Sequence, residues 1–124
     1  MNKNPQISII TPTWNRAAYL ETVWAALTRQ KFKNFEWVVG NDGSTDGTDK
    51  LIRDLARQSH FSVKLVTASE RVGKSRIDNE CVARATGQFI IWCDSDDYFR
   101  PEALEILITE WYSIPNKLRS QFCG

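Results

Sequence analysis

Short apolar runs rich in β-branched residues alternate along this chain with segments that have the hydrophobic periodicity of helices. The apolar runs predict strands at residues 6–11, 35–40, 63–67 and 89–93. The periodic segments predict helices at residues 16–30, 48–58, 74–85 and 102–112. This alternation implies an α/β domain with a mostly parallel sheet, right-handed crossovers and helices on both faces. The length of 124 residues suits one such domain and is too short for two.

Polar loops follow each of the predicted strands directly. They begin at residues 11–13, 41–43, 68–74 and 94–97. In sheets of this kind, ligands bind outside the carboxyl ends of the strands. We therefore expect the four loops to lie along one edge of the sheet and to form one site.

The last of these loops contains three carboxylates, in the sequence DSDD at residues 94–97. It follows residues 89–93 (FIIWC), which we interpret as a buried strand. Crowded carboxylates repel one another and resist desolvation, so a bound cation is expected among them. Oxygen ligands without a nearby His or Cys suit Mg²⁺ or Mn²⁺, which commonly carry phosphate. The alternative interpretation is an ordinary acidic turn, with Asp97 near the start of the next helix.

The second loop opens with Asp42 and is rich in glycine. Glycine permits close approach of the backbone to a ligand, and the Asp42 carboxylate could accept hydrogen bonds from a ribose hydroxyl or a base N–H. The alternative is a capping loop, and we expect Ser44, Thr45 or Asp46 to bind the amide groups of the following helix. In the same way, we expect Asn15 to cap the first predicted helix.

The third loop ends in the tripeptide Gly73-Lys74-Ser75, between a predicted strand and a predicted helix. Together with an apolar strand that ends in Asp94, it mimics a P-loop NTPase. A phosphate cradle requires glycine where Ala68 stands, however, and the carboxylate of Glu70 would repel phosphate. A P-loop-like NTPase stays as an alternative function. Lys74 is expected to contact pyrophosphate in either case, unless it is merely a solvated lysine at a helix start.

Composition narrows the choice of function. Sixteen Lys and Arg against fifteen Asp and Glu give a net charge of +1, which offers no basic field for nucleic acid or a membrane surface. No apolar run approaches the roughly 20 residues of a membrane span. Cys81, Cys93 and Cys123 are odd in number and lack a C-x-x-C pair, so neither a disulfide framework nor a zinc site is predicted. His60, the only histidine, lies in a polar loop and does not support a Ser-His-Asp triad.

Four motifs in order resemble those of family 2 glycosyltransferases. They are residues 8–16 (SIITPTWNR), residues 36–48 (EWVVGNDGSTDGT), Gly73 and Lys74 with Asn79, and residues 85–98 (ATGQFIIWCDSDDY). The resemblance implies a GT-A, Rossmann-like fold and an inverting transfer of a sugar from a nucleotide-diphosphate sugar to an acceptor hydroxyl. It also implies a D-x-D motif that holds Mg²⁺ or Mn²⁺ against the pyrophosphate. A UDP-sugar is the first expectation for the donor and a GDP-sugar the second, with a glycan or a lipid-linked acceptor.

The resemblance also assigns roles to individual residues. The nucleotide-binding residues that it implies are Pro12, Thr13, Asp42, Lys74, Asp94 and Ser95. It implies Asp96 as the main metal ligand, with Asp94 as the second. The chain departs from the family pattern at Asn41, where many members carry Asp, and at Asp78, where many carry Arg. The second departure leaves Lys74, Arg76 or Arg71 to supply a basic group.

In the family, the general base lies downstream of the D-x-D motif, in the acceptor half of the domain. Residues 1–124 are therefore expected to be a partial, donor-binding domain, with the catalytic base outside the chain. A cytoplasmic location is expected, with a longer parent protein peripheral at the inner face of the membrane. A non-catalytic α/β binding module, in which the acidic loop is only structural, is the third interpretation.

Overall fold

The computed structural model describes residues 5–94 and 99–114, in which strands and helices alternate. In chain order the elements are β1 (Ile7–Thr13), α1 (Ala17–Thr28), β2 (Phe35–Asp42), α2 (Thr48–Gln58), β3 (Ser62–Ala68), α3 (Lys74–Arg84), β4 (Phe89–Trp92) and α4 (Ala103–Ser113). The strands form one parallel sheet in the order β3-β2-β1-β4. The predicted alternation and parallel sheet are confirmed. Among the described helices, none is both long and apolar enough to cross a membrane.

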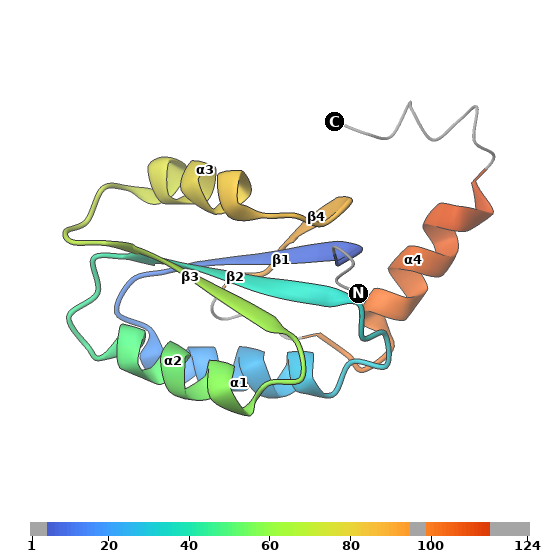
Figure 1. Cartoon of the computed structure of the whole chain (residues 1–124), viewed down its shortest axis with the longest axis horizontal. Coiled ribbons are helices and arrows are strands. Elements are labelled where there is room, and N and C mark those ends of the chain that lie inside the picture. The colour runs from blue at the N-terminus through green and yellow to red at the C-terminus, as the bar shows by residue number, and fades with distance from the viewer. Residues whose placement is uncertain (1–4, 95–98, 115–124) are drawn as a thin grey trace.

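Helices cover both faces of the sheet, as predicted (Figure 1). α1 and α2 lie on one face, over the larger core, which includes the fully buried Trp37. α3 lies on the other face, where Ile77 and Cys81 pack against the sheet in a smaller core. Cys81 and Cys93 are buried free thiols.

The structure extends β1 and β2 by two residues beyond their predicted ends. We placed the end of β1 before Pro12, but the ladder with β2 continues through Pro12 and Thr13. Pro12 lies beyond Ile10, the last residue of β1 that pairs with β4. Among the residues that the structure describes, this stretch of β1 pairs with β2 alone, so a residue without an N–H is tolerated. The extension carries Thr13 and Asp42 to the edge of the sheet where a ligand is expected.

The interpretation of residues 89–93 as a buried strand holds for only one side of β4. Its burial alternates, and Ile90 and Trp92 are 39% and 48% exposed. In the described part of the chain β4 pairs only with β1. Phe89 and Ile91 pack against the larger core, whereas Ile90 and Trp92, on the opposite side of the strand, belong to neither core. Val82 on α3 is also 39% exposed.

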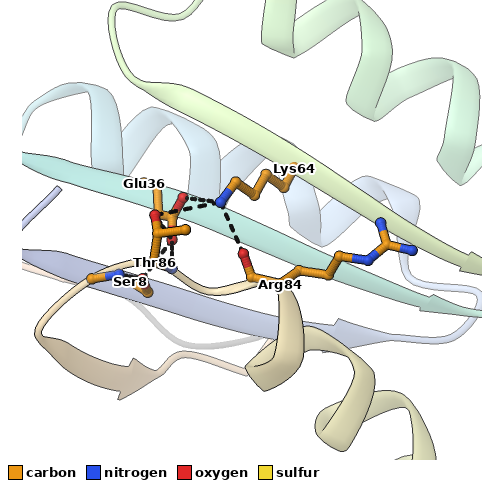
Figure 2. A network of polar contacts seen from close by, with 6 residues as sticks. Ser8, Glu36, Lys64, Arg84 and Thr86 are labelled. Carbon is orange, nitrogen blue, oxygen red and sulfur yellow. Dashed lines mark hydrogen bonds and ion pairs between the residues drawn. The ribbon is translucent and has the colours of Figure 1, made fainter. Parts of the chain in front are cut away.

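A buried network ties the strands together toward their amino ends, on the α3 side of the sheet (Figure 2). At its centre is Glu36 of β2, which is 1% exposed. The Ser8 hydroxyl and the Thr86 backbone N–H donate to Glu36 Oε2 over 2.6 and 2.7 Å, and Lys64 Nζ lies 2.8 Å from Oε1. Burial alone would raise the pKa of Glu36, but the bonds from Lys64 and Ser8 outweigh it, and the pKa lies below its usual range.

Gly87 completes this network, because its N–H donates to the Ser8 hydroxyl over 2.8 Å. A Cβ at Gly87 would lie 2.6 Å from Ser8 Oγ and 2.7 Å from the Ser8 backbone nitrogen. Only glycine therefore fits between β1 and the segment that leads into β4. Glu36, Thr86 and Gly87 all belong to the family-like motifs. Their contacts make them structural residues, far along the strands from the loops that were expected to bind a ligand.

Candidate functional site

A cleft of about 490 Å³ opens at the carboxyl ends of the strands. Its walls are formed by Pro12, Thr13, Trp14, Arg16, Asp42, Arg71, Lys74, Ile77 and Asp94. These residues lie at or just beyond the carboxyl ends of β1, β2 and β4, in the β3–α3 loop and in the first turns of α3. The expectation that these segments meet along one edge of the sheet is confirmed. Every described residue among the predicted nucleotide ligands lies in this cleft. Ser95 and Asp96 lie outside the described residues.

Asp42 is nearly buried, with 4% exposure, and it holds the β3–α3 loop. Its Oδ1 accepts the Val72 N–H over 2.6 Å, and its Oδ2 accepts the Gly73 N–H over 3.1 Å. Arg71 Nε lies 3.8 Å from the same Oδ2. In a P-loop, backbone N–H groups at these positions would point at phosphate. Here they are occupied by Asp42, which argues against the NTPase alternative.

Trp14 and Arg71 form a stacked pair in the cleft wall. The Arg71 guanidinium carbon lies 4.0 Å from the centre of the Trp14 ring. Trp14 is 41% exposed and the Arg71 side chain is 59% exposed, so both are open to a ligand. Sequence reasoning did not select Trp14, Arg16 or Ile77 as site residues. The available signal was the position of Trp14 and Arg16 directly after Pro12 and Thr13, at the end of a strand.

Thr13 is a buried polar residue whose side chain lacks a partner. It is 5% exposed, and its hydroxyl has no hydrogen-bond partner within the described part of the chain. A buried hydroxyl without a partner costs roughly 1–3 kcal/mol of stability. Because Thr13 lines the cleft, a ligand that enters it can satisfy this hydroxyl.

Lys74, the first residue of α3, reaches across to the end of β4. Its Nζ lies 2.7 Å from Asp78 Oδ2 and 5.7 Å from the centre of the Trp92 ring. The hydrogen bond with Asp78 raises the pKa of Lys74, and the charge of Asp94 raises it further. Lys74 is therefore a protonated cation at the side of the cleft where Asp94 lies.

The first two loops interlock beside the cleft, and their contacts correct the prediction that Asn15 caps α1. Asn15 does not cap α1; it has a φ of 50°, and its Oδ1 accepts the Thr45 N–H over 2.8 Å. The Asn15 N–H donates in turn to the Ser44 hydroxyl over 2.9 Å. Asp46 accepts the N–H of Ala17, the first residue of α1. Ser44 and Thr45 thus hold the preceding loop. Asp46 binds both helices, because its carboxylate also accepts from the hydroxyl and the backbone of Thr48, the first residue of α2, as the capping prediction for that helix expected.

Asn41 is nearly buried beside this interlock, with 2% exposure. Its Nδ2 donates to Asp49 Oδ1 over 2.6 Å, and its Oδ1 accepts the Ser44 N–H over 2.9 Å. An aspartate at position 41 would place a second carboxylate against Asp49. Asn41, where the chain departs from the family pattern, is thus the residue that bonds to Asp49 in the first turn of α2.

The structure describes only part of the predicted metal site. Of the two predicted ligands, Asp94 lines the cleft and Asp96 lies outside. Over residues 5–94 and 99–114, no three His, Cys, Asp or Glu side chains group together as a metal site would require. A carboxylate at the mouth of a cleft with no His or free thiol in its lining fits a hard cation such as Mg²⁺ or Mn²⁺.

Curated relatives align with most of this chain. It is 29% identical over 104 residues to the GalNAc(5)-diNAcBac-PP-undecaprenol beta-1,3-glucosyltransferase of Campylobacter jejuni, which covers 84% of the chain and 34% of the relative. It is 35% identical over 103 residues to the poly(ribitol-phosphate) beta-N-acetylglucosaminyltransferase TarS of Staphylococcus aureus, which covers 81% of the chain and 18% of the relative. The chain thus spans about a third or less of the length of these two relatives.

Solved structures share the fold. The complex of S. aureus TarS 1-349 with UDP-GlcNAc matches with a TM-score of 0.80 and 29% identity, over 87% of this chain and 31% of that one. The mannosyltransferase PcManGT from Pyrobaculum calidifontis, in complex with GDP-Man and Mn²⁺, matches with a TM-score of 0.81 and 29% identity, over 91% and 34%. The sequence profile described as Glycosyl transferase family 2 matches residues 8–118. With this match, the ordered motifs and the parallel sheet, the chain belongs to glycosyl transferase family 2 and has the GT-A fold of that family.

Proposed function

We propose that the cleft binds the nucleoside diphosphate of a nucleotide-sugar donor together with Mg²⁺ or Mn²⁺. The protein that contains this domain then transfers the sugar, with inversion, to an acceptor hydroxyl. The observation that carries the proposal is the convergence of Thr13, Asp42, Lys74 and Asp94 on one cleft at the carboxyl edge of the sheet. Support comes from the matching structures, which were solved with UDP-GlcNAc and with GDP-Man and Mn²⁺.

The base and ribose occupy the side of the cleft near β1 and β2. Pro12 and Thr13 line this side, and the unpaired Thr13 hydroxyl bonds to the nucleoside. The exposed ring of Trp14 offers a flat apolar surface for a base. Asp42 keeps the β3–α3 loop in place and offers its remaining lone pairs to the base or ribose.

The diphosphate occupies the side near the amino end of α3 and the end of β4. Arg16, Arg71 and Lys74 supply three cations to the cleft, and two carboxylates, Asp42 and Asp94, stand among the described residues of its lining. The first turn of α3 adds the positive end of its dipole. Asp94 and Ser95 contact the donor, and Asp96 and Asp94 hold the metal. When bound, the cation supplies positive charge that stabilises the departing nucleoside diphosphate.

A UDP-sugar is the first candidate for the donor and a GDP-sugar the second. One curated relative is named for an undecaprenol diphosphate substrate, which supports a glycan or lipid-linked acceptor for the whole protein. Attack by the acceptor hydroxyl requires a general base within hydrogen-bond reach. We assign that base to a part of the protein downstream of the acidic loop, and a location at the inner face of the membrane follows from such an acceptor.

Calorimetric titration tests this proposal. UDP, GDP and ATP are titrated into the chain with Mn²⁺ and with EDTA, and the titrations are repeated on Asp96→Ala and Asp94→Asn. Binding of a diphosphate that requires Mn²⁺ and is lost in both variants is the expected result. Asp54→Asn on α2 removes a carboxylate remote from the cleft lining and should bind like the wild type. ATP binding that survives Asp96→Ala but not Lys74→Ala would instead establish the NTPase.

A further inference from the structure

Lys74 and Asp78 form an ion pair one helical turn apart, beside the cleft. The Lys74 ammonium is 2.7 Å from Asp78 Oδ2 and lies over the Trp92 ring, so it is held between α3 and β4. The Lys74 side chain is 66% exposed, whereas that of Asp78 is only 16% exposed. An exposed ammonium is thus paired with a carboxylate that is itself largely buried.

The stability of α3 does not explain this pair. A lysine in the first turn opposes the helix dipole, and Lys before Asp at this spacing is the weaker orientation. In addition, Asp78 Oδ1 is buried and has no hydrogen-bond partner among the residues that the structure describes. A buried carboxylate oxygen without a partner costs stability. Residues that oppose the helix dipole or leave a buried polar atom without a partner are typically found at functional sites. Lys74 and Asp78 break both rules, and Lys74 lines the cleft.

Asp78 also competes with a second carboxylate for Lys74. Asp94 lines the same cleft, and its charge contributes to the raised pKa of Lys74. Without Asp78, the ammonium would be drawn toward Asp94, the residue to which we assign metal binding. With Asp78 in place, one ammonium proton is used and two are left for a ligand.

We propose that Asp78 is a positioning residue that holds the Lys74 ammonium where the terminal phosphate of the bound nucleoside diphosphate lies. The proposal rests on the proposed function. Asp78 contributes by limiting the conformations of a long, exposed side chain before the ligand arrives, which reduces the entropy lost on binding. Its effect is therefore specific to ligands with a second phosphate, and it depends on the presence of Lys74.

A double-mutant cycle tests the proposal. Asp78→Asn, Lys74→Met and the double variant are titrated with UMP and with UDP in Mn²⁺. We expect Asp78→Asn to weaken UDP binding about three- to tenfold while UMP binding changes less than about twofold. In the Lys74→Met background, Asp78→Asn should have no further effect on either nucleotide. Asp54→Asn is the matched control, because Asp54 also pairs with a lysine at i,i+4, Lys50, on α2.

Each outcome of the cycle decides the question. Equal losses for UMP and UDP, a loss that persists without Lys74, or tighter UDP binding by Asp78→Asn would overturn the positioning role while leaving the proposed function intact. Failure of the folded wild-type chain to bind either nucleotide would overturn the proposed function, and the positioning role with it. Circular dichroism of each variant establishes that it is folded before it is titrated.

Discussion

Replacing Glu36 by glutamine removes the charge at the centre of the network in Figure 2. Glu36 Oε2 accepts bonds from Ser8 and Thr86, so the amide oxygen of glutamine takes that place and its NH₂ group faces Lys64. The charge-assisted bond between Lys64 and Oε1 is lost, which is worth about 1.5–3 kcal/mol, and the glutamine NH₂ then faces the Lys64 ammonium although both groups are donors. Lys64 is 32% exposed and keeps its bond to the Arg84 carbonyl, which limits the penalty. We expect a loss of roughly 2–4 kcal/mol in the free energy of unfolding.

The loss should depend on pH in a defined direction. The pKa of Glu36 is lower in the folded protein than its ordinary value of about 4.3. The stability that the Glu36 charge contributes is therefore fully present at pH values above the ordinary pKa, and it is lost as the pH falls through the pKa of the folded protein. Glutamine does not titrate, so the difference between wild type and variant should shrink as the pH falls below about 4.

Urea unfolding followed by circular dichroism, at pH 7 and at a series of acidic pH values, measures this difference. Glu21→Gln changes an exposed glutamate on α1 and is the control, with an expected change of less than about 0.5 kcal/mol. A difference for Glu36→Gln that is under 1 kcal/mol at pH 7, or that stays constant with pH, would refute the reasoning.

Three further substitutions test other contacts. Gly87→Ala drives a Cβ against Ser8 and should cost about 1–3 kcal/mol in a thermal or urea unfolding experiment; an unchanged midpoint would contradict the tight approach. Asn41→Asp places a carboxylate against Asp49 and should cost a similar amount, which Asp49→Asn in the same chain should largely restore. Thr13→Val removes an unpaired buried hydroxyl, so it should raise the free energy of unfolding by about 1 kcal/mol. It should also weaken nucleotide binding, measured by calorimetry, about three- to tenfold, and tighter binding would show that the hydroxyl does not bond to a ligand.

Much of the fold follows from local patterns in the sequence. The helix at Thr48–Gln58 was predicted with its bounds, because Ile52 and Leu55 recur at helical spacing and both are buried. Several residues of the cleft followed from one topological rule, that parallel strands present their carboxyl ends at one edge. This rule needs only the assignment of strands, and it selected Thr13, Asp42 and Lys74 without any knowledge of the strand order.

The missed features depend on contacts between distant segments. A local motif predicted that Asn15 caps its own helix, but the residue bonds to a loop about 30 positions later. The apolar run of β4 has the pattern of a buried strand, although burial is decided by which helix covers it, and Trp92 is nearly half exposed. Likewise, only the three-dimensional packing of two loops brings Arg71 onto Trp14.

The interlocked loops impose a constraint on any chimera between this domain and its relatives. Asn15 contributes both its backbone N–H and its side chain to residues 44 and 45, and Asp46 binds the start of α1. A graft of residues 14–16 alone, or of residues 43–48 alone, would leave several of these groups without partners. The two segments must therefore be exchanged together in a chimera, although they are about 30 residues apart in the sequence.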